Sequence, residues 1–414
     1  MNCAHSRAFY TIKKDSLIQE KRFMDTRYSK EQVALRQELR DYFTGIMTPA
    51  KVSACIGKEG GPVFREIIQQ LGRDGMLTLG WPAEYGGKDY GAIEQLILFE
   101  EAWKTHTPFP LITLNSVSPS IMAFGTDEQK NFFLPKISKG LATFAVGYSE
   151  PGSGTDLGSL KTKAEFDGEN WIINGTKVWT SAGHDCEYIW LAARTDSDCK
   201  RPSDGITLFI VDAKDPGYSH APIHTVAGVD TNMTYYDNVK VSPDRVVGKI
   251  NGGWKVITSQ LNHERIVLAA MTVIARKQFS YVLNLLTKKG ADGTCRIDDP
   301  LVSAKIGEIY ARLESMEVIN LRSANMVDDG RMDVALASGA KVINTLEQIK
   351  VLRELTAIVG EDAAVQFESE DAIFGGHLEY DYRSAQIMTV GGGVLEVMRS
   401  MTASLGLGMP NTIV

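Results

Sequence analysis

The chain has few cysteines, and their spacing does not suggest a metal site or a disulfide framework. Its 414 residues include five scattered cysteines with no CxxC pair. The seven histidines show no HExxH motif and no clustered spacing. This pattern speaks against the common zinc motifs and against a disulfide-stabilised secreted protein. We therefore expect no bound metal and a reducing, cytoplasmic location.

Long apolar runs and an excess of basic charge are also missing. No stretch approaches the ~18–20 apolar residues that a membrane span requires. Basic residues number 44 and acidic residues 51, which gives a formal net charge of −7. This balance argues against a nucleic-acid partner and for a soluble protein. The length is sufficient for two or three domains with substantial cores.

The first 28 residues lack the features of a secretory signal. They mix Lys, Arg, Ser and aromatic side chains without periodicity, and no apolar region of ~7–15 residues follows the charges. The sequence from Met24 onwards resembles a natural protein start. We expect residues 1–28 to be either a disordered tail or the product of a misplaced start codon, and assign them no function.

Hydrophobic periodicity divides the rest of the chain into three regions. Residues 29–140 combine helical spacing with helix-start signals, such as the pair Ser29 and Gln32, which fits a capping box. Residues 141–250 change to a period of two, which is typical of short strands. Residues 251–414 return to long helical segments typical of a bundle. The predicted fold class is mainly α with a central β domain.

The β region carries clear turn and strand signals. Asp167-Gly168 and Asn174-Gly175 are both expected to be hairpin turns, on either side of a strand at Glu169–Ile173. Short strands with tight turns suggest a small barrel or sandwich. Further strands are predicted at Tyr188–Arg194, Ile206–Val211 and Thr234–Val241.

Two segments of the β region can together hold a flat, anionic, hydrogen-bonding ligand. In the first, Val146–Asp156, glycines allow close backbone approach and small hydroxyls offer donors and acceptors. In the second, Lys177–Gly183, Trp179 offers a broad face for stacking. For either segment alone, a glycine turn and a core Trp is the plain alternative. The candidate ligand-binding residues are Tyr148, Ser149, Gly154, Thr155, Trp179, Thr180 and Ser181.

These segments resemble the flavin-contacting motifs of the acyl-CoA dehydrogenase family. Leu79–Gly87 also resembles an element of that family's N-terminal domain, and the resemblance extends over about residues 30–410. It implies an N-terminal helical domain, a middle β-barrel and a C-terminal four-helix bundle. It also implies FAD as cofactor, an acyl-CoA thioester as substrate, and an electron-transfer flavoprotein as electron acceptor.

The family's reaction requires a base that removes the α-proton of the substrate while hydride leaves Cβ. Most members carry this base as a Glu before a Gly-Thr near the C-terminus, but here the matching positions are Gly392 and Val394. Members that act on branched acyl groups place a Glu-Arg pair on the first helix of the C-terminal domain. Glu264 and Arg265 match that pair. The resemblance therefore implies Glu264 as the base, with Arg265 ordering the site and balancing its charge; a surface ion pair is the alternative.

The resemblance implies roles for further residues. Asn262 matches a position that touches the pantetheine arm of the substrate, and Thr155 is assigned to substrate as well as to flavin. The glycine at 392 would leave space for a bulky acyl group. Glu396 matches a Glu or Gln that neighbours the usual base, and is assigned to the flavin. Glu150, beside the flavin motif, is expected to cap backbone groups.

Half of the family's flavin site is missing from this sequence. Homotetrameric members grip the adenine end of FAD with an Arg-x-x-Phe-Gly element and a Gln followed by a Gly-Gly turn. The matching residues 281–290 and 357–362 contain neither. These departures resemble the α2β2 acyl-CoA dehydrogenases of steroid side-chain breakdown, in which a second subunit supplies the missing contacts. We therefore expect dehydrogenation of a steroid side-chain CoA ester by a heteromeric enzyme.

Three alternatives remain open from the sequence. The first is a homo-oligomeric dehydrogenase of branched-chain or dicarboxylic acyl-CoA. The second is a non-catalytic subunit of a heteromer, in which Glu264 is a helix-surface residue. The third is a flavin oxidase or monooxygenase on the same fold, which reacts with oxygen.

Overall fold

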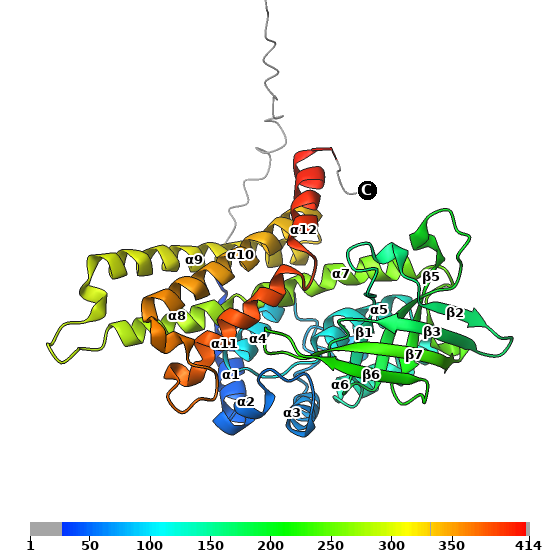
Figure 1. The fold of residues 1–414 in the computed structure, drawn as a ribbon, viewed down its shortest axis with the longest axis horizontal. Helices are drawn as coiled ribbons and strands as arrows, with labels where there is room; N and C mark the ends of the chain where they lie inside the picture. Colours follow the sequence, from blue (N-terminus) through cyan, green and yellow to red (C-terminus); the bar gives the residue numbers. More distant parts are fainter. Residues whose placement is uncertain (1–26, 332, 411–414) are drawn as a thin grey trace, which may run out of the picture.

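The computed structural model describes residues 27–331 and 333–410, apart from the side chains of residues 261–266. Most of the expected leader, residues 1–26, thus lies outside the described part of the chain. The C-terminal helices lie at one end of the molecule and the sheet at the other, and α7 runs from the sheet into the bundle (Figure 1). The predicted order of helices, then strands, then helices is confirmed.

The N-terminal region is helical, and two of its helices begin with capping boxes. At α1, the Gln32 N–H donates to Ser29 Oγ at 3.2 Å, and the Ser29 N–H donates to Gln32 Oε1 at 2.9 Å. Thr126 and Gln129 form the same arrangement at α6. Each box satisfies two N–H groups that the helix itself leaves without partners. The helices are α1 (Lys30–Ile46), α2 (Pro49–Cys55), α3 (Pro62–Arg73), α4 (Ala92–Lys104), α5 (Ser118–Phe124) and α6 (Asp127–Ser138).

In the described residues, the strands form one sheet in the order β6-β7-β3-β2-β4-β5-β8, with β1 parallel to β4. The central strands β4 and β5 are buried along almost their whole length. Their runs of apolar residues follow from this burial on both faces. The strands are β1 (Phe144–Gly147), β2 (Lys163–Phe166), β3 (Trp171–Lys177), β4 (Tyr188–Arg194), β5 (Ile206–Asp212), β6 (Tyr218–Ile223), β7 (Thr231–Val241) and β8 (Val246–Val247).

One of the two predicted hairpin turns is wrong. Asp167-Gly168 does connect β2 to β3, but Asn174-Gly175 lies inside β3, where the register with β7 shifts. Asn174 Oδ1 there accepts the Asn238 N–H at 2.8 Å, and Asn238 has a left-handed φ of 52°. A Cβ on Gly175 would lie 2.4 Å from Thr162 Oγ1. The Asn-Gly pair thus forms a β-bulge with close backbone approach, which shares its composition with a turn.

The C-terminal region consists of long helices, of which α7, α8, α9 and α10 pack against one another. Asp328, the last residue of α9, accepts the Ala92 N–H at 2.5 Å and so caps α4 of the N-terminal region. No helix in the described part of the chain is long and apolar enough to cross a membrane. The helices are α7 (Gly253–Ala270), α8 (Val273–Leu286), α9 (Pro300–Asp328), α10 (Val334–Val359), α11 (His377–Ala385) and α12 (Leu395–Met401).

A buried ion pair joins β3 to the loop that follows β1. Lys177 Nζ lies 2.9 Å from Glu150 Oε1 and donates to the Tyr148 carbonyl at 3.0 Å. The Glu150 carboxylate also accepts the N–H groups of Lys161 and Thr162, at 2.7 and 2.8 Å. Burial lowers the pKa of Lys177 to about 8, against the opposing attraction of Glu150. Glu150 therefore caps backbone groups, as the sequence suggested, and also neutralises a buried ammonium group.

Replacing Lys177 by methionine should destabilise the fold strongly. The change leaves the Glu150 carboxylate buried without its counter-charge, a loss of ~3–5 kcal/mol in similar cases, and the two N–H donors to Glu150 favour the lower end of that range. Denaturant unfolding of the purified protein measures the free energy of unfolding. The matched control is Lys163→Met at an exposed position of β2, for which we expect a change within ~0.5 kcal/mol. Equal, small losses in the two variants would contradict the importance of the ion pair.

Candidate functional site

The two ligand-binding segments predicted from sequence lie side by side at the edge of the sheet that is formed by the C-terminal ends of β1 and β3. One follows β1 and the other follows β3. The Val178 N–H donates to the Ser149 carbonyl at 2.8 Å, and the ion pair of Lys177 and Glu150 joins the same two segments. The structure therefore brings together residues that are about 30 positions apart in the sequence, as a shared site requires.

The hydroxyls of Tyr148 and Thr180, which belong to the predicted site, bind other parts of the protein. The Tyr148 hydroxyl donates to Gln260 Oε1 of α7 at 2.5 Å and accepts from Trp190 Nε1 at 3.0 Å. Thr180 is fully buried, and its hydroxyl lies 3.2 Å from that of Thr234. These contacts connect the site to α7 and to β7. Both side chains therefore help to fix the position of the two segments.

Other predicted residues are open to a ligand. Gly154 and Thr155 are exposed, and a Cβ on Gly154 would meet no atom within 4 Å. The Trp179 side chain is 59% exposed, although it is large and apolar. Its φ of 62° is left-handed, which costs a non-glycine residue ~1–2 kcal/mol. An exposed indole held on strained backbone is a feature of ligand sites, because such strain persists where function requires the geometry.

The turn that carries Trp179 is held by a residue that sequence reasoning missed. Glu59, in the loop between α2 and α3, accepts the Ala182 N–H at 2.8 Å and a hydrogen bond from the Ser181 hydroxyl. Burial raises the pKa of Glu59 to about 7. The Thr180 N–H donates to the Asn232 carbonyl at 3.0 Å. Glu59 had no signal in the sequence, since it belongs to a loop of another region of the chain.

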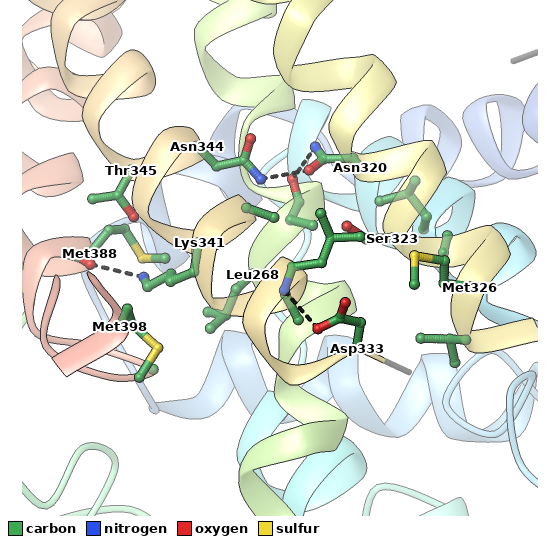
Figure 2. A pocket seen from close by; sticks show the side chains of 18 of the residues that line it. Leu268, Asn320, Ser323, Met326, Asp333, Lys341, Asn344, Thr345, Met388 and Met398 are labelled. Carbon is green, nitrogen blue, oxygen red and sulfur yellow. Dashed lines mark hydrogen bonds between the residues drawn. The ribbon is translucent and has the colours of Figure 1, made fainter. Parts of the chain in front are cut away.

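A second candidate region is a cavity of about 910 Å³, open mouth included, among the helices α4, α7, α9 and α10 (Figure 2). Its lining includes Gly392, the glycine at the usual base position. Gly392 has a left-handed φ of 69°, and a Cβ there would lie 2.2 Å from Leu268 Cδ1 of α7. Leu268 therefore fills the space that a side chain at position 392 would occupy, and the cavity lies beside these two residues.

The cavity has mainly apolar walls with a few polar groups in fixed positions. Lys341 Nζ donates to the Met388 carbonyl at 2.8 Å, and burial lowers the pKa of Lys341 to about 8. Asn344 Nδ2 donates to Asn320 Oδ1 at 2.6 Å (Figure 2). Methionine and leucine side chains form other parts of the wall. An enclosed apolar space with few polar groups is typical of small-molecule sites.

The acidic residues predicted for the site belong to two different helices, α7 and α12. The side chains of Asn262, Glu264 and Arg265 are outside the described residues, so the structure fixes only the position of this segment within α7. Position 264 precedes Leu268 by four residues, and positions four apart share a face of a helix. Glu396 lies in the first turn of α12, exposed and 3.8 Å from Arg399. In Figure 1, α12 is well apart from the sheet.

Family profiles match all three regions of the chain. The profile described as acyl-CoA dehydrogenase, N-terminal domain, matches residues 29–141. The middle-domain profile matches residues 145–239. The C-terminal-domain profile matches residues 251–405. These ranges include both flavin-like segments and the helices that line the cavity.

Relatives and solved structures are similar over nearly the full length. Acyl-CoA dehydrogenase FadE26 of Mycobacterium tuberculosis is 42% identical over 92% of this chain and 98% of its own. FadE29 of the same organism is 41% identical over 92% and 97%. The structure described as the Tcur3481-Tcur3483 steroid ACAD aligns at 42% identity with a TM-score of 0.90, over 94% of this chain and 100% of that chain.

A second solved structure is the ChsE4-ChsE5 complex from Mycobacterium tuberculosis. It aligns with a TM-score of 0.87 at 42% identity, over 93% of this chain and 99% of the matched chain. Profiles, relatives and solved structures therefore agree on the family of this chain. The chain belongs to the acyl-CoA dehydrogenase family and is an oxidoreductase of the acyl-CoA dehydrogenase type.

Proposed function

We propose that this chain is the base-bearing subunit of a heteromeric, FAD-dependent dehydrogenase that acts on a steroid side-chain CoA ester. The observation that carries the proposal is the cavity beside Gly392, where most members of the family carry a carboxylate. A subunit with a glycine at this position needs its base elsewhere. Similarity to a structure described as a steroid ACAD, and to a two-component complex, supports the same reading.

The residues at the edge of the sheet fit a flavin. Trp179 presents an exposed ring for stacking, and the two segments also carry the hydroxyls of Ser149, Thr155 and Ser181. Gly154 leaves open space next to its backbone. Bound FAD would supply the hydride acceptor for oxidation of the substrate. The protein's part is to orient the ring system with groups already held in position.

The base is proposed to be Glu264. Asp333 is the one carboxylate among the described residues of the cavity wall. Its Oδ1 accepts the Ala335 and Leu336 N–H groups, at 2.8 and 3.1 Å, and so caps α10. That leaves a carboxylate from α7, one turn before Leu268. Glu264 would remove the α-proton, Arg265 would balance its charge, and Asn262 would contact the pantetheine arm.

The cavity supports a bulky acyl group. The alanines at 324, 337 and 340 and the glycine at 392 contribute little side-chain volume to its wall. Such a space suits a rigid ring system better than a slim straight chain. The CoA ester of a steroid with a shortened side chain is therefore the proposed substrate.

The surface of the helical region supports a partner subunit. Six large apolar side chains on α9, α10 and the C-terminal segment are 40–74% exposed, and a partner that covers them would remove their apolar surface from water. A second acyl-CoA dehydrogenase-like subunit would cover them in an α2β2 complex and complete the grip on FAD. Electrons would then pass to an electron-transfer flavoprotein. The residues are Val318, Ile343, Leu346, Val390, Leu405 and Leu407.

The variant Glu264→Gln tests the base. It keeps the size of the side chain and removes its basicity, so we expect normal FAD content and a fall in turnover of at least ~10²-fold. Steady-state kinetics with a steroid CoA ester, on the complex with its partner, measures the effect. Glu169→Gln, at an exposed position of the β2–β3 hairpin, is the control and should keep normal turnover. Near-normal turnover of Glu264→Gln would show that the base is another residue.

A pair of glycine variants tests the cavity. Gly392→Ala places a methyl group against Leu268 and strains a left-handed backbone, whereas a Cβ on Gly391 lies 3.3 Å from the Ile387 carbonyl and faces no cavity residue. We expect kcat/KM for a steroid CoA ester to fall ~10-fold or more, relative to a short straight acyl-CoA, in Gly392→Ala. Gly391→Ala should leave that ratio unchanged. If Gly392→Ala also leaves it unchanged, the acyl group binds elsewhere.

A further inference from the structure

Glu59 belongs to the N-terminal helical region, but its side chain contacts a turn of the proposed flavin site in the β region. We infer that Glu59 is a positioning residue, which holds the Trp179–Ala182 turn in the conformation that receives the flavin. The inference rests on the proposed binding of FAD at this edge of the sheet. It assigns a role in cofactor binding to the N-terminal helical region, which contains none of the flavin-binding residues predicted from the sequence.

The contacts of Glu59 are directed at the two residues that follow Trp179 and Thr180. Its Oε2 accepts the Ala182 N–H at 2.8 Å, across 123 positions of sequence. The Ser181 hydroxyl makes a further hydrogen bond to the same carboxyl group. A single side chain thus fixes both the backbone at the end of the turn and the direction of one of its hydroxyls.

The turn needs such support because its backbone is strained at two positions. Trp179 has a φ of 62° and Ala182 a φ of 58°, and neither is a glycine. Left-handed backbone is unfavourable for residues with a Cβ and persists where surrounding contacts hold it. Thr180 between them is held by the Asn232 carbonyl. Glu59 holds the other end of the turn through the Ala182 N–H.

The adjoining residues attach the same loop to Asp185, which follows the turn and donates its own N–H to the Ala182 carbonyl at 3.0 Å. The Gly61 N–H donates to Asp185 Oδ2 at 2.7 Å. Arg65 binds the Asp185 carboxylate through two nitrogens, at 2.9 and 2.8 Å. Gly60 lies so close that a Cβ would be 2.5 Å from Asp185 Cβ. Because Arg65 anchors the loop through Asp185, loss of the Glu59 carboxyl should loosen the turn and leave the loop in place.

Titration of FAD into the deflavinated complex with its partner subunit tests the inference. We expect Glu59→Ala to weaken FAD binding by about tenfold, the equivalent of ~1.4 kcal/mol. Glu59→Gln keeps an oxygen that can accept the Ala182 N–H and should remain within about threefold of wild type. The control Arg65→Met removes the anchoring contacts to Asp185 and Glu187; it should lower the unfolding midpoint and weaken FAD binding clearly less than Glu59→Ala does.

The outcomes separate this inference from the proposed function. A wild-type complex that binds no FAD would remove the proposed function itself. A wild-type complex that binds FAD, with Glu59→Ala equally tight, would overturn only the role of Glu59. If Arg65→Met weakens FAD binding as much as Glu59→Ala does, Glu59 only helps to attach the loop to the β region, and the inference is also overturned. So would a Glu59→Gln variant as weak as Glu59→Ala, because its amide oxygen keeps the proposed contact.

Discussion

The buried ion pair between Lys177 and Glu150 is the contact on which the edge of the sheet depends. Lys177 is fully buried, so its ammonium group requires an acceptor inside the protein. Glu150 provides one, and its carboxylate in turn fixes the N–H groups of two residues that precede β2. The pair thus sets the distance between the loop after β1 and the turn after β3.

The helical part of the molecule contains a cavity lined by α4, α7, α9 and α10. Gly392 and Leu268 approach closely, and the cavity beside them extends between α9 and α10. Two hydrogen-bonded asparagines and a buried lysine hold its polar groups in place. The edge of the sheet and the cavity are connected through α7, whose Gln260 accepts the Tyr148 hydroxyl and whose Leu268 lines the cavity. A shift of α7 would therefore affect both sites.

Features set by local sequence were predictable, and features set by distant partners were not. The capping boxes at Ser29 and Thr126 depend on residues three positions away, and periodicity gave the order of the three regions. Asn174-Gly175 was misread because Asn238, which pairs with the bulge, lies 64 positions further along. Glu59 was missed for the same reason. The pairing of Lys177 with Glu150 also required the fold, although both residues lie in the motifs that indicated the site.

The central claim is that this chain supplies half of a flavin site and needs a second subunit for the rest. Solution mass and flavin content test it most directly, with the chain expressed alone and together with a second acyl-CoA dehydrogenase-like chain. The account predicts little bound FAD for the chain alone, and for the pair an α2β2 complex with about one FAD per pair of unlike subunits. A yellow homotetramer of this chain, with FAD in every subunit, would contradict it.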